Sequence, residues 1–273
     1  MFKTEIDKIS DSSEKKIAYM EKSPFSYVVL SSLAGIYLGF GIVLIFSIGG
    51  PIAAAGGGAY LKLIMGASFG IALSLVIFAG SELFTGNNMV FAVGKLTKRV
   101  GFGPIIKLFI LCFIGNLLGS LFLAYIVVKG GSLTPAAHAL IFKVAAAKMG
   151  LSIDQAILRG ILCNWLVCLA VWISLRTQSE SARLIMIFWC LFAFIASGYE
   201  HSIANQTLLG MALFLPEGAP GVSIAGFVHN QIWVTLGNVI GGGAFVGMAY
   251  YFASPSLRME AGARESELKQ VKR

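Results

Sequence analysis

Two polar stretches decide the fold: AGSELFTGN at residues 79–87 and SGYEHSIAN at residues 197–205. Each lies in the middle of an apolar block that is too long for one ordinary membrane crossing. Aligned without a gap, they share a glycine, a glutamate and an asparagine at an offset of 118 residues: Gly80 with Gly198, Glu82 with Glu200, and Asn87 with Asn205. We therefore predict two broken helices at equivalent positions of an internal repeat.

A second match extends the repeat. GNLLG at residues 115–119 pairs with GNVIG at residues 237–241 at an offset of 122, and the dipeptide Gly-Ile recurs more weakly at residues 35 and 160. Each half then contains three crossings. Because that number is odd, the second half must run through the membrane upside down relative to the first. In inverted repeats of this kind, paired broken helices line the substrate path near the bilayer midplane.

The composition is that of a membrane protein. Of the 273 residues, 57% are hydrophobic and 12% are charged, whereas a soluble domain carries about 25% charged residues. The apolar residues gather in six blocks: residues 26–48, 62–94, 105–128, 156–175, 184–215 and 228–252. The predicted fold class is an all-α integral membrane protein. It has six transmembrane helices in two inverted three-helix repeats, and helices 2 and 5 are broken.

The basic residues predict the orientation. Sixteen of the 21 lysines and arginines fall in the termini and in the loops on the same side of the membrane. Five fall on the opposite side: Lys62, Lys129, Lys143, Lys148 and Arg159. Since cytoplasmic segments hold the excess of basic residues, both termini are expected in the cytoplasm of a bacterium, with the chain in its inner membrane. This orientation accounts for the net charge of +8. Nucleic-acid binding is not expected, because the sequence has no basic stripe on a soluble module.

Three segments flank or connect the spans. Residues 1–25 have apolar residues at helical spacing and predict an amphipathic helix on the membrane surface or on the face of the bundle, although a solvated helical tail fits equally. Residues 129–155 predict a short helix at the outer face. Residues 253–273 predict a polar, disordered tail. The membrane domain is thus residues 26–252, with repeats at about 26–128 and 156–252.

Three titratable side chains stand out within the spans. An intramembrane charge costs at least about 2.5 kcal/mol, so Glu82 and Glu200 either hold broken backbone by hydrogen bonds or take part in conduction. His201 stands where the first repeat has Leu83. A histidine there either passes a proton to an anion or is a buried, hydrogen-bonded imidazole. No second His or Cys lies at ligand spacing, so no zinc and no other cofactor is expected.

The motifs AGSELFTGN, LCNWLVCLAVW (residues 162–172), SGYEHSIAN and VTLGN (residues 234–238) occur in that order over the six spans. This combination resembles the formate/nitrite transporter family over residues 25–252, and most strongly its bacterial nitrite channel branch, with the formate channel branch as the near alternative. The resemblance implies an aquaporin-like protomer, assembly as a homo-pentamer in lipid, and one pore in each protomer.

The resemblance also implies pore residues. The break of the second span corresponds to Leu83, Phe84 and Thr85, and the fifth span carries the pore histidine, His201. The outer side of the narrow region is then bounded by Phe69, Phe194 and His201, and the inner constriction by Leu73, Leu83, Phe84 and Val167. Polar residues on the outer route correspond to Asn164 and Lys148, and Asn238 is expected near the pore histidine.

These parts suit small monovalent anions of weak acids. Two hydrophobic rings exclude hydrated ions, a donor between them assists the anion, and Lys148 attracts anions at the entrance. We expect a channel for nitrite, with formate or hydrosulfide as the alternative. A water or glycerol channel fits the architecture but lacks the twin Asn-Pro-Ala motifs. An intramembrane enzyme using Glu200 and His201 has no nucleophile and no substrate-sized lobe, so no catalytic residue is predicted.

Overall fold

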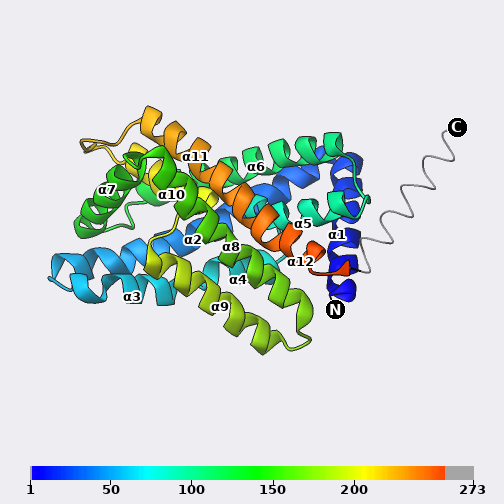
Figure 1. The fold of residues 1–273 in the computed structure, drawn as a ribbon. Coiled ribbons are helices and arrows are strands. Elements are labelled where there is room, and N and C mark those ends of the chain that lie inside the picture. Colours follow the sequence, from blue (N-terminus) through cyan, green and yellow to red (C-terminus); the bar gives the residue numbers. More distant parts are fainter. Residues whose placement is uncertain (1, 256–273) are drawn as a thin grey trace, which may run out of the picture.

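The computed structural model describes residues 2–255, and the regular elements in this part of the chain are all helices (Figure 1). Most of the predicted tail, residues 256–273, lies outside the described residues. Six helical stretches are long and apolar enough to cross a membrane: Pro24–Ala54, Gly58–Phe78, Phe102–Lys129, Ile153–Arg176, Glu180–Ser197 and Ile224–Phe252. The all-helical membrane fold predicted from the apolar blocks is confirmed.

Each repeat is built on a close pair of long helices. In the first, α2 (Pro24–Ala54) packs along α6 (Phe102–Lys129). In the second, α8 (Ile153–Arg176) packs along α11 (Ile224–Gly242), which continues through the π-helix η1 (Gly243–Met248) into α12 (Ala249–Phe252). Glycines lie at both contacts, where Gly119 faces the Ser32 backbone and Gly160 faces Gly237. Small residues let the two backbones approach closely. The resulting van der Waals packing holds the helices together in lipid, where the hydrophobic effect does not drive helix association.

Both predicted broken helices are present. Helix α3 (Gly58–Ser68) leads into α4 (Ile71–Phe78), and after a break the chain continues as α5 (Phe84–Leu96). Helix α9 (Glu180–Ser197) is likewise followed by α10 (Ser202–Phe214). Gly80 and Gly198 have φ of +76° and +73°. Glycine adopts this left-handed conformation without strain, which explains why a repeated glycine follows directly after Ala79, the C-cap of α4, and directly after Ser197, the last residue of α9.

The two ends of the described chain meet on one side of the bundle (Figure 1). Helix α1 (Lys3–Lys22) lies there beside α12, and the rings of Phe2 and Tyr250 are 5.1 Å apart. The apolar residues of α1, among them Ile6 and Ile9, are buried against the bundle. In the structure, α1 therefore packs on the face of the bundle through its apolar residues. Helix α7 (Pro135–Met149), the short helix expected between spans 3 and 4, lies at the opposite end.

Candidate permeation pathway

Three cavities lie in series between the broken helices. The cavity partly lined by α1 has a volume of about 480 Å³, the central chamber about 10 Å³, and the cavity partly lined by α7 about 220 Å³. The first and the last are named the inner and the outer vestibule after the orientation that the basic residues predict. Leu73 and Leu83 line both the inner vestibule and the chamber, and His201 lines both the chamber and the outer vestibule. Shared walls place the three cavities along one route that is narrowest at its centre.

The central chamber is apolar except for one imidazole. Its lining residues are Leu38, Phe69, Leu73, Leu83, Val167, Leu191, Phe194 and His201. The rings of Phe69 and Phe194 meet edge to face at 5.6 Å, and Phe194 stacks on His201 at 5.9 Å. Because a single water needs about 10–15 Å³, the chamber has room for no more than about one, and a hydrated ion does not fit.

The two ring nitrogens of His201 have different partners. His201 is the N-cap of α10, and its Nδ1 accepts a hydrogen bond from the backbone N–H of Ala204 at 3.1 Å. Its Nε2 lies 3.0 Å from Thr85 Oγ1. Since a backbone N–H only donates, Nδ1 carries no proton, and the neutral ring bears its proton on Nε2. His201 therefore donates to the Thr85 oxygen, and the Thr85 hydroxyl keeps its own proton for an acceptor.

Two asparagines hold the breaks in the same way. Asn116 Oδ1 accepts from the N–H of Phe84 at 2.9 Å, and Asn238 Oδ1 accepts from the N–H of Ser202 at 2.9 Å. Each asparagine also donates through Nδ2 to the carbonyl of the glutamate in the same break, again at 2.9 Å. Backbone groups freed by a break are costly to leave unpaired within a membrane. The GN motifs of the repeat therefore stabilise the two breaks.

Two residues expected on the pore surface lie behind it. Asn164 is fully buried and joins the two breaks, with Nδ2 donating to the carbonyls of Thr85 at 3.1 Å and Asn238 at 2.6 Å. It lines none of the three cavities. The first break ends at Leu83, so Phe84 starts α5 instead of lying in a loop, and its ring packs on Phe109 and Phe113 of α6. Phe84 is therefore absent from the chamber wall.

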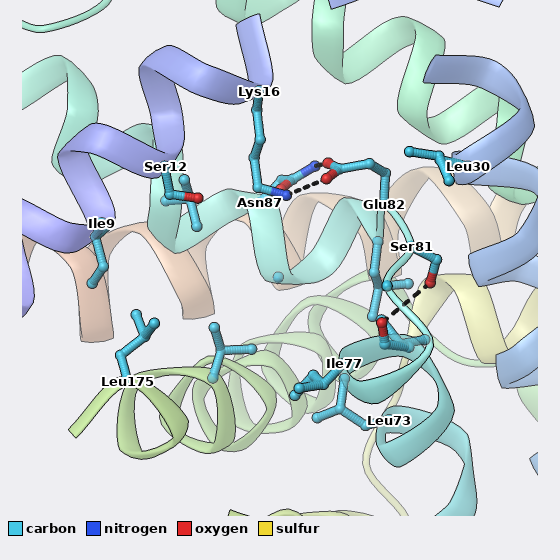
Figure 2. Close-up of a pocket in the computed structure, with 16 residues that line it drawn as sticks. Ile9, Ser12, Lys16, Leu30, Leu73, Ile77, Ser81, Glu82, Asn87 and Leu175 are labelled. Carbon is cyan, nitrogen blue, oxygen red and sulfur yellow. Dashed lines mark hydrogen bonds and ion pairs between the residues drawn. The ribbon is translucent and has the colours of Figure 1, made fainter. Parts of the chain in front are cut away.

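An ion pair stands at the inner vestibule (Figure 2). Lys16 points from α1 to Glu82, with Nζ 2.5 Å from Oε1. The other carboxylate oxygen accepts from Tyr27 at 3.1 Å and from Asn87 Nδ2 at 3.2 Å. Glu82 is thus both held in a network and exposed to the vestibule, which it lines together with Lys16 and Asn87.

The outer vestibule repeats this arrangement. Lys148 Nζ on α7 lies 2.7 Å from Glu200 Oε1, and Asn205 Nδ2 donates to Oε2 at 2.6 Å. Lys148 and Asn205 line the vestibule, whereas Glu200 is buried behind them. A buried carboxylate is tolerated when an opposite charge and hydrogen bonds satisfy its oxygens. Each break therefore has a lysine, a glutamate and an asparagine beside it, and each lysine comes from a helix outside the repeat.

Sequence reasoning missed three of these residues. Leu191 lines the chamber opposite the first repeat and stands 118 residues after Leu73, so the offset of the two breaks was a signal that pointed to it. Lys16 lies in residues 1–25, where only the spacing of the apolar residues was interpreted. Leu38 had no signal, because it is one leucine in a uniformly apolar span.

The family model described as formate/nitrite transporter matches residues 3–252. The chain belongs to the formate/nitrite transporter family. Among curated relatives, the nitrite transporter NirC of Escherichia coli (strain K12) is 42% identical over 256 residues, with 93% of each chain covered. The formate channel FocA of the same strain is 29% identical over 253 residues, with 84% of this chain and 87% of FocA covered.

Comparison with solved structures finds members of the same family. An FNT family ion channel matches with a TM-score of 0.88 at 41% identity, covering 93% of this chain and 100% of that one. A pentameric formate channel with formate bound matches with a TM-score of 0.74 at 27% identity, covering 85% and 98%. In this formate/nitrite transporter, the matched residues 3–252 include both breaks and every residue that lines the three cavities.

Proposed function

We propose that the protein is a membrane channel for small monovalent anions of weak acids, with nitrite as its principal substrate. The single observation that carries this proposal is the chamber of about 10 Å³, whose one polar lining group is His201. Nitrite is favoured over formate because identity to the nitrite transporter NirC is 42%, against 39% to a probable formate transporter of Methanothermobacter thermautotrophicus and 29% to the formate channel FocA.

Helix ends support the choice of an anion. Helices α5 and α10 both begin at the breaks, at Phe84 and Ser202. A helix N-terminus carries about half a positive charge, and both of these ends lie beside the chamber. No carboxylate lines the chamber, and each glutamate of the breaks is paired with a lysine. The centre of the route is therefore electrostatically suited to a negative ion.

Hydrogen bonding supports a weak acid. An anion in the chamber has lost its hydration shell and needs a donor in its place. His201 supplies this donor, since its Nε2–H is given to the Thr85 oxygen at 3.0 Å in the structure and an anion in the chamber competes with that oxygen for the proton. An anion that accepts this hydrogen bond, or takes up a proton and crosses as the neutral acid, passes the apolar rings at lower cost.

The remaining parts of the proposal concern the cell and the assembly. The protein functions in the bacterial inner membrane with both termini in the cytoplasm, so that the vestibule lined by α1 is the cytoplasmic one. It assembles as a pentamer with one pore per protomer, as expected from the pentameric formate channel it resembles. Residues 26–252 form the channel domain, and residues 1–25 contact its cytoplasmic end.

Competitive flux in proteoliposomes tests the proposal. Nitrite and formate uptake are compared between pH 5 and 8 in wild type and in His201→Ala, with water- and glycerol-driven swelling as the neutral-solute control. We expect nitrite to be taken up faster than formate, and both fluxes to fall at least about tenfold in the variant, a change equivalent to about 1.4 kcal/mol. Anion flux that is unchanged by His201→Ala would contradict the role of the imidazole, and glycerol flux without anion flux would contradict the substrate class.

A further inference from the structure

The two vestibules differ in net charge although their glutamates correspond. In the inner vestibule the charged lining residues are Lys16 and Glu82, which are paired with each other. The outer vestibule is lined by Lys62 and Lys148. The charge of Lys148 is compensated by Glu200 at 2.7 Å. Lys62 has no carboxylate partner among the described residues and is exposed. It is therefore the uncompensated charge of the outer vestibule.

We propose that Lys62, rather than Lys148, recruits anions to the outer mouth of this transporter. The inference rests on the proposed function and names the residue that serves it at the outer entrance. Lys62 lies in α3, and its neighbours Leu61 and Met65 on the same helix line the same vestibule. A lysine stem packs along apolar surface while its ammonium reaches water, so Lys62 adds positive charge at the mouth without closing it.

Electrostatics distinguishes the two lysines. A charge paired at hydrogen-bond distance acts on a distant ion as a dipole, whose field falls steeply. An unpaired charge acts at longer range, over a screening length of about 8 Å at physiological salt. At a separation of a few ångströms in water, one unit charge raises the local anion concentration several-fold. Lys148 then serves mainly to hold Glu200 and the second break.

The position of Lys62 also fits a simpler role, in which it binds lipid headgroups at the end of its span and has no effect on permeation. The two roles differ in their kinetics. Recruitment lowers the half-saturating anion concentration from the outer side only, and this effect disappears at high ionic strength. A headgroup anchor leaves the half-saturating concentration unchanged.

Nitrite uptake by the full-length protein in oriented vesicles tests the proposal, with nitrite added on either side at ionic strengths of about 0.01 M and about 1 M. The variants are Lys62→Gln, Lys62→Glu and, as a matched control, Lys143→Gln, an exposed lysine of α7 that does not line the vestibule. We expect Lys62→Gln to raise the half-saturating nitrite concentration about threefold at low ionic strength, and Lys62→Glu to raise it further. The shift should occur only with nitrite on the α7 side, with an unchanged maximal rate, and should vanish at high ionic strength.

Two results distinguish a failure of the role proposed for Lys62 from a failure of the proposed function. If wild type transports nitrite but Lys62→Gln is indistinguishable from it, or is matched by Lys143→Gln, the role of Lys62 is overturned and the proposed function stands. If wild type transports neither nitrite nor formate, the proposed function itself is overturned.

Discussion

At the scale of single residues, the centre of the route depends on one donor chain. Ala204 donates to His201 Nδ1, and Nε2 faces Thr85 Oγ1 at 3.0 Å. The threonine is fully buried and does not line the chamber. Its hydroxyl therefore acts through the imidazole, by accepting the ring proton and fixing which nitrogen carries it.

Replacing Thr85 by valine tests this chain, because valine keeps the shape and removes the hydroxyl. The buried Nε2–H then loses its acceptor, at a cost of about 1–3 kcal/mol. We expect nitrite flux to fall roughly tenfold in Thr85→Val while Thr85→Ser, which keeps the hydroxyl, retains most of it. Initial uptake rates in proteoliposomes measure both. Equal flux in wild type and Thr85→Val would show that the hydroxyl takes no part in permeation.

The asparagines of the breaks lead to a prediction about stability. Asn238→Leu removes the partners of the Ser202 N–H and of the Gly160 and Glu200 carbonyls. With about 1 kcal/mol or more for each group left unpaired, we expect a loss of about 3 kcal/mol. For a chain of this size that corresponds to a fall in Tm of roughly 5–10 °C. Thermal unfolding of the purified protein measures it.

The control for this prediction is Asn88→Leu. Asn88 is also a buried asparagine beside the first break, but its side-chain nitrogen and oxygen have no hydrogen-bond partner in the structure. Its replacement by leucine should leave Tm nearly unchanged. The mirror variant Asn116→Leu should behave like Asn238→Leu. If all three variants lowered Tm equally, loss of an asparagine in the core, and not loss of the break's hydrogen bonds, would account for the effect.

At the scale of elements, the contact of α2 with α6 depends on glycine. A methyl group at Gly119 would overlap the Ser32 carbonyl, whereas a methyl group at Gly103, in the same helix, meets nothing within 4 Å. We expect Gly119→Ala to lower stability by about 1–3 kcal/mol, since the two backbones must move apart. Gly103→Ala should be neutral or stabilise by up to about 1 kcal/mol through its helix propensity. Thermal unfolding compares them, and equal Tm values for both variants would contradict the close contact.

The elements also show how far the sequence predicts this fold. The breaks were predictable because both follow a repeated glycine, and the left-handed conformation of Gly80 and Gly198 supplies the physical reason. The direction of Phe84 was not predictable from the motif. With the break ending at Leu83, Phe84 starts a helix, and the phase of that helix turns its ring toward α6.

The same limit applies to contacts between distant elements. The partner of Glu82 is Lys16, 66 residues earlier in the chain, and periodicity within α1 indicates only which face is buried. The resemblance to the family placed Asn164 among the polar residues of the pore, but its depth behind the wall follows from how α8 packs against α5 and α11. The positions of the breaks were therefore predictable from the repeat, whereas the contacts of Lys16 and Asn164 with other elements were not.

At the scale of the whole molecule, equivalent ion pairs stand beside the two breaks, on opposite sides of one chamber. Lys16 with Glu82 lies on the side of α1, and Lys148 with Glu200 lies on the side of α7. The symmetry fails at the centre, where His201 takes the place of Leu83, and at the mouth, where Lys62 has no counterpart in the inner vestibule. We expect His201 to determine how an anion is assisted through the chamber, and Lys62 to determine from which side anions are recruited.

The orientation of the molecule is the last prediction. Sixteen of the 21 basic residues belong to the termini and the loops on their side, and such an excess favours the cytoplasm. We expect Lys143→Cys, on α7, to react with a membrane-impermeant maleimide in intact cells, and Lys107→Cys, near the start of α6, to react only after permeabilisation. The four native cysteines are buried, so background labelling should be low. Labelling of Lys107→Cys but not of Lys143→Cys in intact cells would reverse the orientation, and with it the assignment of Lys62 to the outer mouth.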